Sequence, residues 1–309
     1  MPGSMRLVLR SFLVWLVLLS AAPAQVRAWR RPSGDQNLSI EVGGVTRTYL
    51  LHIPKDLPEG KQVPLVMVFH GGGGRAVTMP NFTHFDQEAD KHGFLVAYPE
   101  SVNKSWNDTR NLSPGDDVGF VRALISALEH EHGADPKRIY AAGISNGGFF
   151  SNRLACDLSD QIAAIAAVAA TMPETLVPVC KPSHPISVLY MHGSKDPIVH
   201  IDGGPVLRDR GNAISLKQAS EFWRKFDQTS DKPSVTNLPD DAGDGTSIHC
   251  ETYSGGKQGT EVVVYTIVGG GHAWPGSSQY LPAFIIGKAS QNLDATATIW
   301  DFFAKHSLP

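Results

Sequence analysis

The chain contains 309 residues, of which 42% are hydrophobic and 18% are charged, and its formal net charge is −3. These values exclude a disordered chain and are sufficient for a large buried core, so one folded domain is expected. The small negative charge gives no indication of a nucleic-acid partner.

The N-terminal segment has the features of a secretory signal peptide. Arg6 and Arg10 form a basic start, residues 11–20 are a short apolar stretch, and Ala22-Pro23-Ala24 has the small-x-small pattern of a cleavage site. The apolar stretch is shorter than the about 20 residues that a membrane span needs. We expect cleavage, a secreted or periplasmic location and no membrane attachment afterwards; an uncleaved anchor is the alternative.

The sequence divides into three predicted regions. Residues 1–24 are predicted to be the signal peptide, residues 25–44 a flexible polar leader, and residues 45–309 one folded domain. In the last region short apolar runs alternate with stretches of helical spacing, which indicates a mostly parallel sheet with helices on both faces. The oligomeric state stays open.

A buried strand is predicted at 64–69, and it runs directly into His70-Gly71-Gly72-Gly73-Gly74. Backbone without side chains can approach a bound molecule closely, so this loop is suited to present an N–H to an oxygen that gains negative charge. We expect the amide of Gly72 to be such a donor and the ring of His70 to order the loop. A plain flexible turn is the alternative, but the position after an early strand argues against it.

The next predicted strand, 94–98, leads into a long loop that contains Trp106. The flat face of this side chain is suited to stack on a phenolic or sugar ring, and packing that holds the loop in place is the alternative role. A helix is expected after the loop because apolar residues recur at helical spacing from Val118 to Leu128, with Asp116 or Asp117 as its cap.

The segment Gly143-Ile144-Ser145-Asn146-Gly147 lies between a predicted buried strand, 138–142, and a run through Cys156 that is compatible with a helix. In the context of strand, sharp turn and helix, a Gly-x-Ser-x-Gly sequence forms a nucleophile elbow that holds the serine hydroxyl outward. Ser145 is therefore the candidate nucleophile, and the amide of Asn146 is the second candidate donor to an oxyanion. The pentapeptide also occurs by chance in loops, so a base and an acid must be found for it.

Both partners follow predicted strands further along the chain. Asp196 comes shortly after the strand 185–192, and His272 follows the strand 261–268 on a loop that begins Gly269-Gly270-Gly271. Open α/β sheets place their chemistry outside the carboxyl ends of the strands, so these loops are expected to converge on Ser145. Trp274, two residues after His272, is a second aromatic candidate for substrate contact, with packing as its alternative role.

Other histidines and acids have simpler interpretations. His52 and His249 lie within predicted strands, where a histidine is usually structural. His200 and Asp202 are the only substitutes that we consider for the triad, and a place on the rim of the site is their alternative. The acidic loop 240–244 lacks the bidentate Glu and the spacing of an EF-hand, so we expect a solvated turn and no metal site.

The chain has three cysteines, which is consistent with an exported protein. Cys156 is expected near the end of the helix after the elbow and Cys180 in the loop before the strand that leads to Asp196. A disulfide between them would contribute roughly 3 kcal/mol to stability. Cys250 would then be unpaired; a different pairing, or three buried thiols, are the alternatives.

These motifs together resemble the α/β-hydrolase superfamily and, within it, the secreted esterases that comprise polyhydroxybutyrate depolymerases, feruloyl esterases and acetylxylan esterases. The resemblance covers about Val45 to the C-terminus and is carried by short segments of the chain: 47–54, 70–72, 105–107, 116–120, 143–148, 192–196 and 269–276. There is one departure, because several depolymerase relatives carry cysteine where this chain has Gly72. The Ser-Asn-Gly-Gly elbow is more similar to the feruloyl and acetylxylan esterases.

The resemblance implies an α/β-hydrolase catalytic domain over 45–309, without a large lid domain, and a triad of Ser145, Asp196 and His272 that needs no metal or organic cofactor. It implies hydrolysis of feruloyl or acetyl esters of plant polysaccharide, with a polyester such as polyhydroxybutyrate as the alternative. A serine peptidase and a binding protein with a degenerate site are further alternatives. The peptidase would usually bring a propeller or a large cap, and the binding protein is disfavoured because every catalytic position is filled.

Overall fold

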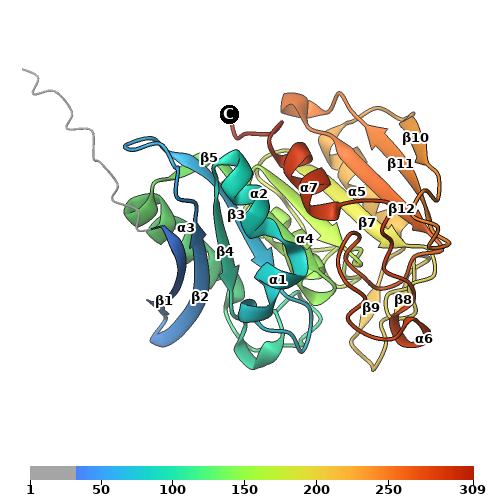
Figure 1. Cartoon of the computed structure of the whole chain (residues 1–309), viewed down its shortest axis with the longest axis horizontal. Coiled ribbons are helices and arrows are strands. Elements are labelled where there is room, and N and C mark those ends of the chain that lie inside the picture. Colours follow the sequence, from blue (N-terminus) through green and yellow to red (C-terminus); the bar gives the residue numbers. More distant parts are fainter. Residues whose placement is uncertain (1–32) are drawn as a thin grey trace, which may run out of the picture.

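The computed structural model describes residues 33–309, which form an α/β sandwich around a ten-stranded sheet (Figure 1). The strand order is β1-β2-β4-β3-β5-β6-β7-β12-β11-β10. The strands from β4 to β12 in this order are parallel, and those at both edges are antiparallel. This confirms the predicted α/β-hydrolase fold with a mostly parallel central sheet.

The strands of the sheet are β1 (Gly34–Val42), β2 (Val45–Ile53), β3 (Val63–Phe69), β4 (Leu95–Pro99), β5 (Ala134–Ile144), β6 (Ala164–Val168), β7 (Ser187–Gly193), β10 (Ser234–Leu238), β11 (Ser247–Tyr253) and β12 (Val262–Val268). A separate pair consists of β8 (Gly204–Pro205) and β9 (Asn212–Ala213). The helices are α1 (Met79–Thr83), α2 (Phe85–His92), α3 (Asp117–His132), α4 (Asn146–Asp157), α5 (Leu216–Asp227), α6 (Ala283–Ile286) and α7 (Ala295–Phe303).

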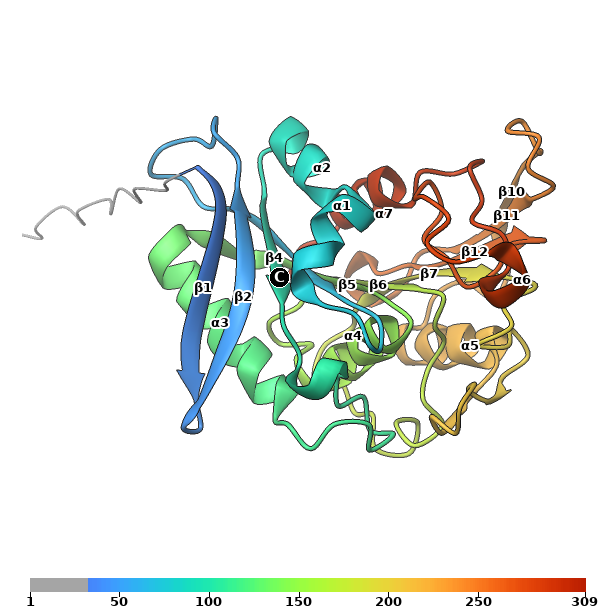
Figure 2. The same cartoon turned by 60° about the horizontal axis from the view of Figure 1, so that its bottom comes forward.

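Helices cover both faces of the sheet. Figure 2 shows α3, α4 and α5 on one side and α1, α2 and α7 on the other. Each face has its own apolar core: in β3, Leu65 and Met67 belong to the first and Val66 and Val68 to the second. Because successive side chains of a strand point to opposite faces, a strand covered on both sides has a continuous apolar sequence, which explains why the central strands were predictable.

The first residues of α3 and α7 show which side chains cap these helices. Asp116 caps α3, its side chain accepting from the amide of Gly119, and Asp294 caps α7. The alternative cap, Asp117, is instead buried in an ion pair with Arg47 at 2.8 Å. Within residues 33–309, no helix combines the length and the apolar character that crossing a bilayer requires.

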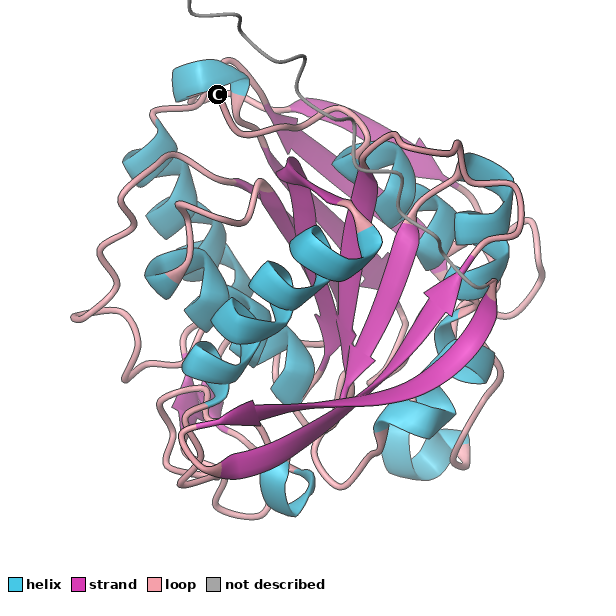
Figure 3. Ribbon diagram, turned by 90° about the vertical axis from the view of Figure 1, so that its left-hand side faces the viewer, coloured by secondary structure: helices cyan, strands magenta, loops and turns pink. Residues whose placement is uncertain are grey.

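The prediction of a flexible leader is wrong for its second half. Gly34–Val42 forms strand β1, which pairs with β2 along its whole length and makes one edge of the sheet (Figure 3). The turn between them uses Gly43 and Gly44, which have φ of 58° and 77°, as a tight two-residue hairpin requires. Leu38, Ile40 and Val42 pack against the core from alternate positions. The predicted signal peptide, 1–24, lies outside the described residues.

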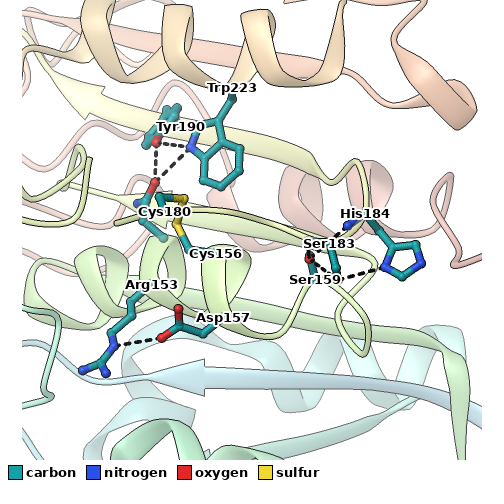
Figure 4. Close-up of a disulfide and its surroundings, with 10 residues drawn as sticks. Arg153, Cys156, Asp157, Ser159, Cys180, Ser183, His184, Tyr190 and Trp223 are labelled. Carbon is teal, nitrogen blue, oxygen red and sulfur yellow. Dashed lines mark hydrogen bonds and ion pairs between the residues drawn. A yellow bond between two sulfur atoms is a disulfide. The ribbon is translucent and has the colours of Figure 1, made fainter. Parts of the chain in front are cut away.

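The predicted disulfide between Cys156 and Cys180 is confirmed, with a Cα–Cα distance of 4.9 Å (Figure 4). It joins the end of α4 to the segment before β7, and it leaves Cys250 as a buried free thiol. The bond closes a loop between residues 24 positions apart. A loop of this size corresponds to about 3 kcal/mol of stability in the chain-entropy account.

A buried carboxyl at the end of α5 makes the stability of the fold depend on pH. Asp227 Oδ1 accepts from the amide of Ile186 at 3.1 Å, while Oδ2 has no hydrogen-bond partner in the part of the chain described. Burial raises the pKa of Asp227 to about 7, against the effects of that amide and of Lys257. The unfolded carboxyl ionises near pH 4 (about 3.9), so the free energy of unfolding should fall as the pH rises from about 4 to about 7 and then level off.

The free energy of unfolding of Asp227→Asn is therefore expected to exceed that of the wild type by a larger amount at pH 8 than at pH 4. Urea denaturation at both pH values measures this difference. Asp301→Asn, on the exposed side of α7, is the matched control and should show the same difference from the wild type at both values. An Asp227→Asn curve that stays parallel to the wild-type curve from pH 4 to pH 8 would contradict the assignment.

Candidate active site

Ser145 lies at the sharp turn between β5 and α4, with φ of 55° and ψ of −120°. The glycines on either side make this turn possible. A Cβ on Gly143 would come within 2.4 Å of the backbone of Gly147, and a Cβ on Gly147 within 2.2 Å of the carbonyl oxygen of Phe69. No side chain can be accommodated at such distances without a backbone shift, so the local geometry is that of a nucleophile elbow.

His272 and Asp196 are joined by a hydrogen bond of 2.7 Å between Nδ1 and Oδ2, and both side chains are buried. The other oxygen of Asp196 accepts from the amides of Ile198 and Val199 at 2.8 and 2.9 Å. Burial alone would raise the pKa of the Asp196 carboxyl, but the hydrogen bond and charge of His272 outweigh it and hold that pKa below its usual range. The carboxylate is therefore ionised and fixes the orientation of the imidazole ring.

Ser145 and His272 line the same pocket. The sequence predicted that these three side chains meet, and the structure brings all three to one end of the sheet. Within residues 33–309, the Ser145 hydroxyl makes no hydrogen bond to His272. In ligand-free hydrolases this contact is often long and tightens when substrate binds.

A second histidine, which the sequence did not indicate, lies behind the acid. His192 is fully buried at the end of β7; its Nε2 donates to the carbonyl of Val199 at 2.9 Å and lies 3.8 Å from Asp196 Oδ2. Burial lowers the pKa of His192, although the nearby Asp196 acts in the opposite direction. A neutral ring here supports the loop after β7 without competing with His272 for the charge of Asp196.

The two candidate oxyanion donors are neighbours at the pocket wall. Gly72 and Asn146 both line the pocket, and a Cβ on Gly72 would lie 3.6 Å from the Cβ of Asn146. Asn146 is the first residue of α4, whose first amides have no acceptor within the helix. His70 orders the glycine loop: its Nδ1 is 2.8 Å from the carbonyl of Gly71, and its Nε2 accepts from the amide of Ser101.

The prediction that Trp106 and Trp274 contact substrate is wrong. Their side chains are 0% and 1% exposed, and neither lines the pocket. Trp274 donates to the hydroxyl of Thr296 in the core on the α7 side. Trp106 lies beneath the glycine loop, where its Nε1 donates to the carbonyl of His70 at 3.0 Å and its ring stacks on Phe150. Both rings pack in the interior, which is the role given above as the alternative to substrate contact.

A buried polar network, also absent from the sequence prediction, connects Trp106 with the elbow. The side chain of Asn146 accepts from the amide of Trp106 at 2.7 Å and donates to Asp108 Oδ2 at 2.7 Å. Asp108 is paired with Arg110 at 2.5 Å, and the Arg110 guanidinium lies over the ring of Phe149. Because these polar groups are mutually bonded, the network holds the amide of Asn146 in one position relative to the loop 70–74.

Trp106→Phe should therefore lower kcat by disturbing the glycine loop. It keeps an aromatic ring against Phe150 but leaves the buried carbonyl of His70 without its donor, at a cost of about 1–3 kcal/mol. The matched control is Trp223→Phe, which removes indole hydrogen bonds to Asn152 and Tyr190 elsewhere in the same core, near the disulfide (Figure 4). Both variants should unfold at lower temperature, but only Trp106→Phe should lose turnover. An equal kcat in the two variants would contradict this role.

The pocket has a volume of about 490 Å³ and lies at the carboxyl ends of the parallel strands. One group of lining side chains is apolar and surrounds Ser145: Met79, Phe82, Ile144, Phe149, Ile198, Val206, Leu207, Leu281, Ile285 and Ile286. Three of these side chains are also open to solvent and form the outer rim of the pocket: Leu207, Leu281 and Ile285 are 49%, 43% and 44% exposed. The pocket therefore offers an apolar volume beside the serine and a wide mouth.

The remaining candidates lie elsewhere. His200 and Asp202 do not line the pocket. The loop 240–244 is a turn in which Asp240 and Asp244 bond to Asn292, as expected for a structural role. His249 bonds to the side chain of Asn237 across two strands.

His52 lies in a group of acids distant from the pocket. Its Nδ1 is 2.8 Å from Asp35 and its Nε2 is 3.2 Å from Asp90, with Asp86 close by. Burial lowers the pKa of His52, but the bonds to these carboxylates outweigh it, and the net shift is upward. Both ring nitrogens lie within hydrogen-bonding distance of a carboxylate, and Asp35, His52 and Asp86 also have a geometry that suits a metal ion. The contacts with the carboxylates account for His52 as a structural residue.

Comparisons with known proteins show the family to which the chain belongs. Residues 48–208 match the family model "Esterase PHB depolymerase". A protein of Nocardia uniformis subsp. tsuyamanensis described as an esterase, NocK, is 33% identical over 294 residues, which are 88% of this chain and 84% of the relative. Feruloyl esterase B of Piromyces equi is 31% identical over 236 residues; the match covers 74% of this chain but 42% of that protein.

Two solved structures share the fold at low sequence identity. A thermostable esterase superposes with a TM-score of 0.57 at 17% identity, covering 89% of this chain and 63% of the other. An acetyl xylan esterase from Aspergillus awamori gives 0.56 at 13% identity, covering 78% and 94%. Given the fold, the family match and the serine elbow, the chain belongs to the esterase family of polyhydroxybutyrate depolymerases and is a serine carboxylic ester hydrolase.

Proposed function

We propose that the chain hydrolyses carboxylic esters with a triad of Ser145, His272 and Asp196. The observation that carries the proposal is the 2.7 Å hydrogen bond between His272 and Asp196 in a pocket that His272 shares with Ser145. In this mechanism His272 takes the hydroxyl proton while Ser145 Oγ attacks the ester carbonyl. Asp196 keeps the proton of His272 on Nδ1 and stabilises the imidazolium that forms.

The tetrahedral intermediate needs donors for its negative oxygen, and we assign this role to the amides of Gly72 and Asn146, two neighbouring residues that line the pocket. The alcohol leaves with the proton that His272 had taken. Water, activated by the same imidazole, then cleaves the acyl-serine ester and releases the acid. Each step uses groups of this chain alone, so the mechanism requires neither a metal nor an organic cofactor.

For the substrate we propose an ester of an aromatic acid such as a feruloyl group on plant polysaccharide. The pocket of about 490 Å³ is much larger than an acetyl group needs, and the apolar side chains beside Ser145 suit a flat aromatic acyl group. Feruloyl esterase B is among the similar proteins. Acetyl esters of polysaccharide and polyhydroxybutyrate are the alternatives, the latter because the family is named for its depolymerases.

The test compares methyl ferulate, acetylated xylan and a polyhydroxybutyrate film with the purified enzyme, with Ser145→Ala as the control. Hydrolysis of methyl ferulate with the highest kcat/KM, and none by the variant, is the expected result. Erosion of the film without release of ferulate would replace the aromatic ester by the polyester. Failure to hydrolyse any of these or p-nitrophenyl acetate would overturn the esterase assignment, and cleavage of a peptide amide instead would favour a peptidase.

We further propose that the protein is exported. The basic and apolar start of the sequence, with its small-residue site at Ala22-Pro23-Ala24, supports this, and so does the disulfide, a bond that persists in oxidising compartments. N-terminal sequencing of the mature protein tests it. A first residue shortly after Ala24 is expected, and a mature protein that still begins at Met1 in the cell would contradict export.

A further inference from the structure

The mouth of the pocket contains two arginines without an acidic partner. Arg208 and Arg210 both line it. Six other arginines of the described chain form ion pairs with aspartates: Arg47, Arg110, Arg122, Arg138, Arg153 and Arg224. Within residues 33–309, neither Arg208 nor Arg210 has a carboxylate within 4.0 Å, although Asp209 lies between them in sequence.

Arg210 is close to the site of the chemistry. A Cβ on Gly72 would come within 2.2 Å of Arg210 Nη1, so the guanidinium occupies space that any other residue at position 72 would take. Gly72 is also the candidate donor to the oxyanion. The charge of Arg210 is therefore next to the carbonyl that Ser145 would attack.

The local backbone supports this placement. Residues 206–211 form a tight turn in which the amide of Val206 donates to the carbonyl of Gly211 at 2.9 Å. Arg208 and Asp209 have φ of 65° and 51°, a left-handed conformation that costs free energy for residues with a side chain. Within this turn, Arg208 and Arg210 both line the pocket.

The charges of the pocket do not cancel. No aspartate or glutamate is among its lining residues in the described part of the chain, and the charge of Arg110 is neutralised by Asp108. Most of the other lining side chains are apolar. A guanidinium presents two parallel N–H donors, a geometry that matches a carboxylate, and at an apolar wall such a pair is stronger than in open solvent.

We propose that Arg210, with Arg208 as a second cation, selects esters that carry a free carboxylate close to the scissile bond. This inference rests on the proposed ester hydrolysis by Ser145 and adds a preference for charge that does not depend on whether the acyl group is aromatic. The carboxylate can belong to the acyl part or to the alcohol part of the ester. Since the ester linkage itself is neutral, removing this charge from the substrate should remove the contribution of Arg210 without changing the reaction.

The test uses two matched pairs of esters at low ionic strength. For a carboxylate on the acyl part, p-nitrophenyl hydrogen glutarate is compared with p-nitrophenyl methyl glutarate, following nitrophenolate. For the alcohol part, 3-acetoxybutanoate is compared with its methyl ester, following acetate. In at least one pair the wild type should have a kcat/KM about tenfold or more higher for the acid, as a charge-assisted hydrogen bond would give, and salt should reduce this preference.

The variants decide whether Arg210 is responsible. Arg210→Gln should lower kcat/KM for the acid by a larger factor than for its methyl ester and so abolish the preference, whereas Arg210→Lys should keep part of it. Arg208→Gln should reduce it by a smaller factor. Arg75→Gln is the matched control, because Arg75 is exposed near the same glycine loop but does not line the pocket.

The possible failures are distinguishable. If the wild type hydrolyses the methyl esters, Ser145→Ala does not, and neither acid is preferred, the proposal for Arg210 is overturned and the proposed function stands. If Arg210→Gln slows acids and methyl esters equally, the guanidinium acts on the carbonyl that all substrates share, and selection of a carboxylate is again overturned. If no ester is hydrolysed, the proposed function itself fails.

Discussion

Ser145→Ala is expected to lower turnover at least about 10³-fold, the range seen when a serine nucleophile is removed from a triad. The variant keeps the elbow backbone but has no oxygen with which to form an acyl-enzyme. The hydroxyl of Ser145 makes no hydrogen bond within residues 33–309, so its removal should leave the thermal unfolding midpoint unchanged. The measurement is kcat on p-nitrophenyl acetate together with a thermal denaturation curve.

Ser151→Ala is the matched control for this loss. Ser151 lies in the same helix, α4, and its buried hydroxyl donates to the carbonyl of Gly147 at 3.0 Å, away from the pocket lining. It should retain turnover within a few-fold. A Ser145→Ala protein with more than a tenth of the wild-type rate would require a different nucleophile and would end the triad assignment.

Gly147→Ala is expected to have the second largest effect, a loss of about 100-fold in kcat/KM. Its Cβ would come within 2.2 Å of the carbonyl oxygen of Phe69 and 2.7 Å of that of His70, both rigid backbone atoms. The elbow must therefore move away from the loop 70–74, which separates Ser145 and Asn146 from Gly72, the other candidate oxyanion donor. Overpacking of this kind also costs about 1–3 kcal/mol of stability.

Gly71→Ala provides the comparison in the same region. The nearest atoms to a Cβ at this position are 3.5 Å away, an ordinary contact distance, and its φ is not in the left-handed region. This variant should unfold at the wild-type temperature or slightly above it. If Gly147→Ala matched Gly71→Ala in both stability and kcat/KM, the close approach of α4 to β3 would not be what positions the serine.

The sequence predicted the parts of the site that are set by local backbone. Ser145, Asp196 and His272 each follow a strand that is apolar on both faces, and such strands are visible as continuous hydrophobic runs. Parallel strands have their carboxyl ends at one edge, so the convergence of the three loops followed from the fold class. The disulfide was predictable because the same order of strands and helices puts Cys156 near the end of the helix after the elbow and Cys180 in the loop before the strand that leads to Asp196.

The errors concern properties that only tertiary packing decides. β1 was missed because an edge strand exposes every second residue, and polar residues there conceal the alternation of Leu38, Ile40 and Val42. Trp106 has a flat aromatic face in a long polar loop, which suggests substrate contact, but that loop folds inward and buries the ring. Arg210 carries no sequence signal because Gly72, beside it in the fold, is distant in the chain. His192 is only four residues from Asp196, but it lies within a predicted strand and nothing in the sequence indicates that it faces the acid.

The position of His272 near Ser145 depends on glycine residues in the loops that support it. β12, which precedes His272, lies three strands away from β5 in the sheet, a separation of roughly 14 Å at about 4.8 Å per strand. The connecting loops cross this distance stacked directly on one another: a Cβ on Gly193 would meet the carbonyl of Gly271 at 2.3 Å, and one on Gly271 would meet that of Ile286 at 2.1 Å. Substitution of Gly193 or Gly271 would therefore displace the imidazole of His272 from Ser145. New substrate preferences are thus expected to arise by exchanging side chains in 198–210 and 279–286, the two outer walls, while this glycine stack is left intact.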